Sequence, residues 1–176
     1  MMLRACAFWI IFLICAVDPS ACFATTYKDV QIGARVVDFL ANPPLGRVPA
    51  AVIFDSRNRD SQEDAKNIVT WLAADSSRSK TSFLPVLVDI QDLSSVEGVR
   101  VGFVASATEA GFGTILELAR KNGMLTISSD LSCVRSGRCT VGVSSAPRVE
   151  VIVSRQVSQE SGVNFTEAFR MMVTEY

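Results

Sequence analysis

The chain has 176 residues, with 17 basic and 18 acidic side chains and no histidine. The charges are balanced and no block of like charge stands out, which excludes proteins that recognise nucleic acids or membrane surfaces through charge. The missing histidine excludes Ser-His-Asp and Cys-His catalysis as these sites are usually built.

An apolar segment at the N-terminus indicates export. Arg4 precedes an apolar run over residues 5–17, and small residues stand at Cys22 and Ala24, where a signal peptidase reads the chain. The run of about 13 residues is shorter than the ~20 that a membrane-spanning helix needs. We therefore predict a signal peptide over residues 1–24, a single domain over residues 25–176, and no membrane insertion after cleavage. An uncleaved N-terminal anchor is the alternative.

Strands and helices alternate along the domain. Apolar runs of strand length occur at residues 48–54, 83–88, 99–105 and 124–127. Apolar residues also recur with helical spacing, as in Ala65, Ile68, Val69 and Leu72. We expect capping boxes at Asp60 with Glu63 and at Ser106 with Glu109. This succession predicts a parallel sheet with helices on both faces.

The last part of the domain changes character. Two β-rich runs, residues 139–143 and 149–153, flank Ser144-Ser145-Ala146-Pro147, and this pattern predicts an antiparallel hairpin. The whole domain is therefore expected to be an α/β three-layer sandwich, with a mostly parallel sheet and a C-terminal antiparallel hairpin.

Cys133 and Cys139 are the cysteines that remain after the signal peptide is removed. Export brings them into a compartment where disulfides persist. Without histidine, two thiols make a poor zinc site, and their spacing is not the Cys-x-x-Cys of thiol redox enzymes. We predict a structural disulfide that contributes about 2 kcal/mol; two small buried thiols are the alternative.

Polar residues follow the predicted parallel strands at their carboxyl ends, where open α/β sheets bind ligands. Helix N-termini after the first two sites add N–H donors that suit an anion. Helix caps and turns are the alternative reading of these residues. The predicted ligand crevice consists of Asp55, Ser56, Arg57, Ser106, Thr108, Ser128, Ser129 and Asp130.

Partial enzyme motifs are present but lack their context. Ser77-x-x-Lys80 matches the pattern of penicillin-binding proteins, yet it lies in a Ser-rich loop without partner motifs. Gly111-Phe112-Gly113 begins like a dinucleotide fingerprint, but Leu116 stands where the third glycine belongs. We expect no catalysis, no cofactor and no metal site.

Several segments in the second half of the chain carry a family resemblance. They are residues 101–106, 125–130, 140–143, 148–154 and 169–172. In this order they resemble the YfiR/HmsC family of small periplasmic proteins, whose late strand is followed by a short helix and a final aliphatic segment. Val153 replaces the asparagine of that strand, and the Cys133–Cys139 loop replaces a Gly-Gly pair.

The resemblance implies a periplasmic, non-catalytic regulator. Its partner would be the exported part of an inner-membrane signalling protein, a diguanylate cyclase, with control of cyclic-di-GMP and biofilm behaviour. Arg135 and Arg138 are then the partner-binding candidates, because arginine is enriched at interface hot spots. The alternative is that both are ordinary solvated charges on a turn closed by the disulfide.

A single-lobe periplasmic small-molecule binding module, serving transport or sensing, is the competing function. Against it, periplasmic receptors usually clamp their ligand between two lobes, and the predicted domain supplies one. A homodimer stays open in either case.

The first testable prediction concerns processing. Protein released from the periplasm should begin at Thr25, because the apolar run is too short to span a bilayer and small residues precede this position. N-terminal sequencing or intact-mass measurement checks this. Recovery of the full-length chain in the membrane fraction would contradict it.

Overall fold

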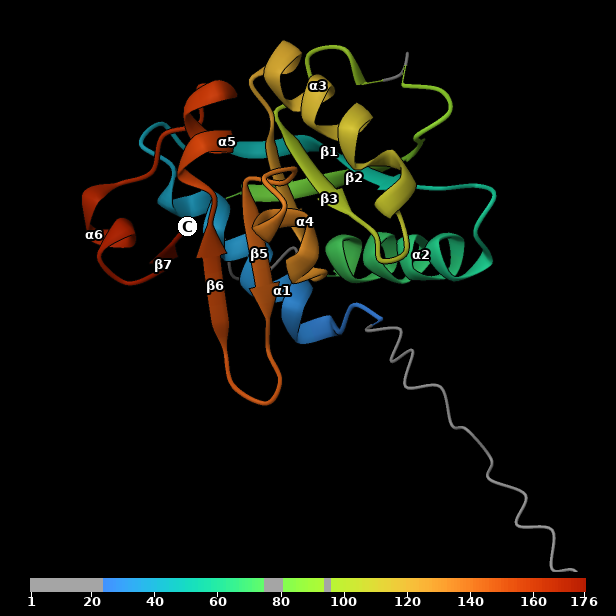
Figure 1. The fold of residues 1–176 in the computed structure, drawn as a ribbon, viewed down its shortest axis with the longest axis horizontal. Coiled ribbons are helices and arrows are strands. Elements are labelled where there is room, and N and C mark those ends of the chain that lie inside the picture. Colours follow the sequence, from blue (N-terminus) through green and yellow to red (C-terminus); the bar gives the residue numbers. More distant parts are fainter. Residues whose placement is uncertain (1–23, 75–80, 94–95) are drawn as a thin grey trace, which may run out of the picture.

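The computed structural model describes residues 24–74, 81–93 and 96–176. Residues 1–23 of the predicted signal peptide and the Ser77–Lys80 motif lie outside the described residues. Within them, one sheet contains seven strands in the order β2-β1-β3-β4-β5-β6-β7 (Figure 1). The strands are β1 (Gly46–Phe54), β2 (Thr81–Asp89), β3 (Val101–Val104), β4 (Leu125–Ser128), β5 (Val141–Ser144), β6 (Glu150–Val153) and β7 (Thr174–Glu175).

The strand directions confirm the predicted fold class. All neighbouring strands are parallel except β5 and β6, which form the antiparallel hairpin. The alternation within β1 shows why the sheet needs cover on both sides: Ala50 and Val52 belong to one apolar core, while Ala51 and Ile53 belong to another. A parallel sheet buried on both faces reads as a continuous apolar run, which is the pattern in the sequence.

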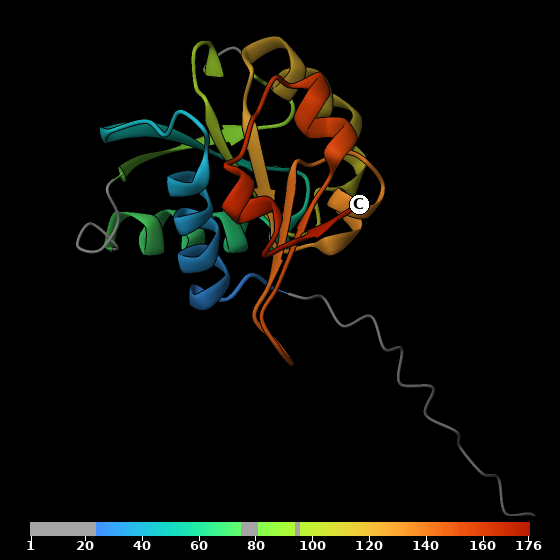
Figure 2. The same cartoon turned by 90° about the vertical axis from the view of Figure 1, so that its left-hand side faces the viewer.

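Helices supply that cover from both sides (Figure 2). Helices α1 (Tyr27–Val36), continued by the 3-10 turn η1 (Val37–Phe39), and α2 (Arg59–Ala74) pack on one face; η3 (Glu109–Gly111), α3 (Phe112–Asn122) and α4 (Leu131–Arg135) lie on the other. The short helices α5 (Arg155–Glu160) and α6 (Glu167–Arg170) follow the hairpin. In the described part of the chain, no helix combines the length and apolarity needed to cross a membrane.

Both expected capping boxes are wrong. Asn58, not Asp60, caps α2, because its Oδ1 accepts from the backbone N–H of Asp60 at 2.9 Å. Ser106 does not begin a helix, since α3 starts only at Phe112, after the 3-10 turn η3. Several polar residues near each helix start suit the cap position, and the pattern alone does not choose among them.

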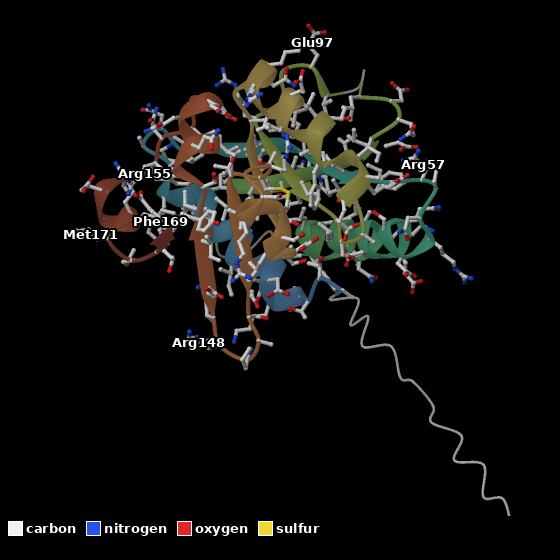
Figure 3. The ribbon with its side chains drawn as sticks, viewed as in Figure 1. Arg57, Glu97, Arg148, Arg155, Phe169 and Met171 are labelled. Carbon is white, nitrogen blue, oxygen red and sulfur yellow. A yellow bond between two sulfur atoms is a disulfide. The ribbon has the colours of Figure 1, made fainter. Side chains whose placement is uncertain are left out.

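A charged cluster attaches the C-terminus to the sheet. Glu175 on β7 accepts from Arg155 Nε at 2.9 Å and from Arg170 Nε at 2.7 Å, next to the backbone pairing of β7 with β6. Figure 3 shows the side chains in this region, with Arg155 and Phe169 labelled. These hydrogen bonds, from Arg170 first and Arg155 second, lower the pKa of Glu175 from 4.5 to about 2.

The second prediction is a pH dependence. The lowered pKa of Glu175 means that its stabilising effect is complete above pH 4.5 and is lost as the pH falls toward 2. Glu175→Gln should therefore lower the free energy of unfolding by about 1 kcal/mol at neutral pH. Near pH 2 the substitution should leave the free energy of unfolding unchanged. Denaturant titrations at several pH values check this.

Glu167→Gln is the matched control, because the Glu167 carboxylate lies 3.8 Å from Arg170 and its side chain is 79% exposed. Its effect should be close to zero at every pH. Equal effects of the two substitutions would contradict the role of Glu175.

Candidate binding groove at the carboxyl ends of the strands

A groove of about 470 Å³ opens beyond the carboxyl end of β4. Its sides come from the N-terminal segment with α1, from the start of α4, and from the tip of the β5–β6 hairpin, which projects from the body of the domain (Figure 1). We call it the carboxyl-end groove; it is lined by Ala24, Thr26, Asp29, Ser129, Asp130, Leu131, Ser132, Arg135, Ser144, Ser145, Ala146, Pro147 and Glu150.

The N-terminal side of the groove is a true capping box. The Thr26 hydroxyl donates to Asp29 Oδ2 at 2.6 Å, and the Asp29 backbone N–H donates back to Thr26 Oγ1 at 3.2 Å. Thr26 Oγ1 also lies 3.1 Å from Ser145 Oγ, so the start of α1 is tied to the hairpin tip. Asp29 Oδ1 is buried and has no hydrogen-bond partner among the described residues. Asp29 lines both this groove and a small internal hollow beside Val30 and Ser128.

The α4 side of the groove contributes both an acidic and a basic side chain. Asp130 caps α4 by accepting from the Ser132 backbone N–H at 2.8 Å. Arg135, in the last turn of α4, is exposed and lines the groove. Together with Asp29 and Glu150, the lining holds three carboxylates and one guanidinium. It therefore favours an occupant with a cationic group, and Arg135 provides one position for an anionic group.

The two cysteines hold the loop that follows α4. The sulfur atoms of Cys133 and Cys139 lie at bonding distance, and the Cα atoms are 5.2 Å apart, which is compatible with the expected disulfide. Both residues are fully buried in the apolar core beneath α3. Arg138 lies between them and is exposed, but it does not line the groove. The two arginines proposed together from the sequence therefore occupy different surroundings.

The predicted ligand crevice is divided by the strand order. Asp55, Ser56 and Arg57 follow β1, and Arg57 lies far from Arg148 of the hairpin in Figure 3. Here Asp55 pairs with Arg57 Nη2 at 2.9 Å, and hydrogen bonds from Arg57 lower the pKa of Asp55. This cluster is separate from the carboxyl-end groove, which contains only Ser129 and Asp130 of the predicted crevice.

Three other predicted residues are buried and satisfied within the protein. The Thr108 hydroxyl donates to the carbonyl of Ala105 at 2.8 Å, and the Ser128 hydroxyl donates to the carbonyl of Val104 at 3.2 Å. The Ser106 backbone N–H donates to Asp64 Oδ2 at 2.8 Å. These groups shape the turns after β3 and β4 and do not face the groove lining.

Sequence reasoning missed the N-terminal contribution to the site. The sequence contains a signal for this contribution, because Thr26 and Asp29 have the spacing of a capping box. Asp64 had no such signal, because it occupies an ordinary polar position of an amphipathic helix. Among the described residues, no group of His, Cys, Asp or Glu has the arrangement of a metal site.

Comparison with known proteins supports the fold alone. No family model and no curated protein matches the chain. One similar solved structure is the ABC domain in complex with L-Trp from Streptococcus pneumoniae, with 11% identity and a TM-score of 0.59. The alignment covers 84% of this chain and 60% of that one, so the chain spans less than two thirds of its length.

The third prediction tests the close packing of α4 on the sheet. A Cβ at Gly142 of β5 would lie 2.5 Å from Val134 Cγ1 and 3.0 Å from Leu131 Cδ2, both on α4. Gly142→Ala should lower the free energy of unfolding by about 1–3 kcal/mol, because overpacking displaces the helix. Denaturant unfolding of the mature domain checks this.

Gly113→Ala is the control, since nothing lies within 4 Å of a Cβ at that exposed helical position. It should be neutral or stabilise the domain by up to about 1 kcal/mol. If Gly142→Ala is equally harmless, α4 is not held against β5 as described.

Proposed function

We propose that this protein is a non-catalytic binding protein of the periplasm. It binds the exported part of an inner-membrane signalling protein, and the resemblance to the YfiR/HmsC family implies that this partner is a diguanylate cyclase. Binding restrains the partner and thereby controls cyclic-di-GMP and biofilm behaviour. This role needs no chemical step by the chain itself.

The carboxyl-end groove is the observation that carries the proposal. It combines the carboxylates of Asp29, Asp130 and Glu150, an exposed guanidinium on Arg135, and surrounding loops held by the hairpin and by α4. Recognition residues are commonly placed on loops that a rigid scaffold positions. We therefore assign the groove to a partner segment with a basic residue directed at Asp29 and an acidic residue directed at Arg135.

The order of the C-terminal elements also supports the proposal. The late strand β6 is followed by the short helix α5 and by a final segment that returns to the sheet as β7. This is the order on which the family resemblance rests. In addition, Leu84, Val86 and Leu87 are exposed on the edge strand β2, as is common for surfaces that meet another protein.

A small-molecule binding module is the second candidate, favoured by the groove volume. About 470 Å³ falls within the range of small-ligand sites, and the groove lies beyond the carboxyl end of a parallel strand. The structural neighbour was solved with L-Trp. A zwitterion would fit the charges, with its ammonium near Asp29 and its carboxylate near Arg135.

The fourth prediction separates the groove from the remainder of the loop. Arg135→Glu should weaken binding of the exported part of the partner about tenfold, because it removes the only guanidinium in the lining and adds a fourth carboxylate. Arg138→Glu makes the same charge change on the same loop, outside the groove, and should have a smaller effect. The measurement is calorimetry with the exported domain of a membrane-bound diguanylate cyclase from the same organism.

Equal affinities of wild type and Arg135→Glu would exclude the groove as the interface. The small-molecule function would be favoured by two results together. No partner domain binds, and an amino acid added at a hundredfold excess over its Kd raises the melting temperature of the protein. Saturation of this kind stabilises the folded state by about 2.7 kcal/mol. Cyclic-di-GMP levels in a deletion strain provide the cellular readout.

A further inference from the structure

Asp64 is a buried carboxylate without a countercharge. It lies in α2 with 3% of its surface exposed, and it accepts three hydrogen bonds, from the Thr25 backbone N–H, the Thr25 hydroxyl and the Ser106 backbone N–H. Among the described residues, no Lys or Arg forms an ion pair with it. An unpaired buried charge is costly, so buried charges in proteins are normally paired.

The residue that contacts Asp64 most closely is Thr25, which is 8% exposed. Its backbone nitrogen lies 2.9 Å from Asp64 Oδ1, and its hydroxyl lies 2.7 Å from Oδ2. Thr25 is also the residue that signal cleavage after Ala24 would place at the N-terminus. Its nitrogen would then be an α-amino group, which is protonated at neutral pH because its ordinary pKa is about 7.7–8.0.

We propose that Asp64 is the binding site for the α-ammonium group of the processed chain. Signal peptidase and water hydrolyse the Ala24–Thr25 peptide bond, Ala24 leaves with the new carboxylate, and the Thr25 nitrogen becomes an ammonium group with its added protons. The neutral hydrogen bond between Thr25 N and Asp64 Oδ1 thereby becomes a buried ion pair. Processing supplies the countercharge that the unprocessed chain lacks.

The position of this pair in the fold explains why it matters. The strand order changes direction between β1 and β3, and the Ala105 backbone N–H donates to the carbonyl of Ile53 at 2.9 Å across this point. In doubly wound sheets the crevice at this reversal is where ligands bind. Asp64 and Ser106 line a hollow here together with Ala24, and Thr25 hydrogen-bonds to Asp64 beside it. The processed N-terminus thus serves as a built-in ligand.

The same residue connects the crevice to the carboxyl-end groove. Thr25 Oγ1 lies 2.7 Å from Ser129 Oγ, and the next residue, Thr26, contacts Asp29 and Ser145 of the groove. Anchoring the α-ammonium group on Asp64 therefore fixes one side of the groove. We infer that the groove reaches its final form only in the processed protein.

The test compares three N-termini of the domain: a free Thr25, an Nα-acetylated Thr25, and a chain that begins one residue earlier at Ala24. Acetylation keeps the N–H donor and removes the charge, whereas the Ala24 form moves the charge by one residue, off the Thr25 nitrogen that donates to Asp64 Oδ1. Each modified form should show an unfolding equilibrium constant about tenfold larger than that of the free Thr25 form, because hydrogen bonds to charged groups are the stronger class.

Asp64→Asn should abolish these differences, and Glu63→Gln should preserve them. Glu63 is the matched control, because it is an exposed acid on the same helix and lines the same small hollow as Asp64. Equal stability of the three forms in the wild-type background would overturn the proposal. So would finding that the exported protein begins at a residue other than Thr25.

A second measurement covers the case in which Asp64→Asn does not fold. Competitive acylation at neutral pH, read by mass spectrometry, should modify the Thr25 α-amine of the native protein at least tenfold more slowly than the α-amine of the Ala24 form. Equal rates would overturn the proposal. Neither measurement uses a binding partner, so the outcome is independent of the proposed regulatory function.

Discussion

The central strands must be covered on both faces, and the other features of this domain depend on that constraint. Strands β1 and β3 carry fully buried residues on both sides, so one pair of helices packs on one face and α3 with α4 packs on the other. Because helices occupy both faces, the strand ends are the part of the sheet that a groove can reach. The carboxyl ends meet the hairpin and the N-terminal segment there, and this is where the groove lies.

The polar network at that edge joins distant parts of the chain. Asp64 of α2 binds Thr25 and the turn after β3, and Thr25 lies 2.7 Å from Ser129 after β4. The buried polar side chains of Asp64 and Thr25 are matched by partners from other elements, as burial requires. Asp29 Oδ1 differs, because it is buried and unpartnered within the described residues.

The fold class could be predicted from the sequence because buried strands and helices leave the clearest patterns of apolar residues. The continuous apolar run that became β1 and the two β-rich runs around Ser144–Pro147 predicted the parallel core and the hairpin correctly. The crevice could be predicted only in part, since chain order does not reveal which strands are neighbours in the sheet, where β3 lies between β1 and β4. Asp55 and Ser129 both follow strands, yet the sheet order separates them. Capping residues were misassigned where Asn58 and Asp60 offered equivalent side chains two positions apart.

The antiparallel direction of β6 has a consequence for how this protein can diverge. Because β5 runs toward the carboxyl edge and β6 returns from it, the connecting tip at Ser144–Pro147 stands free of both apolar cores while forming one side of the groove. Residues inserted or removed in pairs at this tip would reshape the groove and leave every buried contact of the sheet unchanged. The shape of the groove and the stability of the fold can therefore change independently in this domain, with the hairpin tip as the part free to vary.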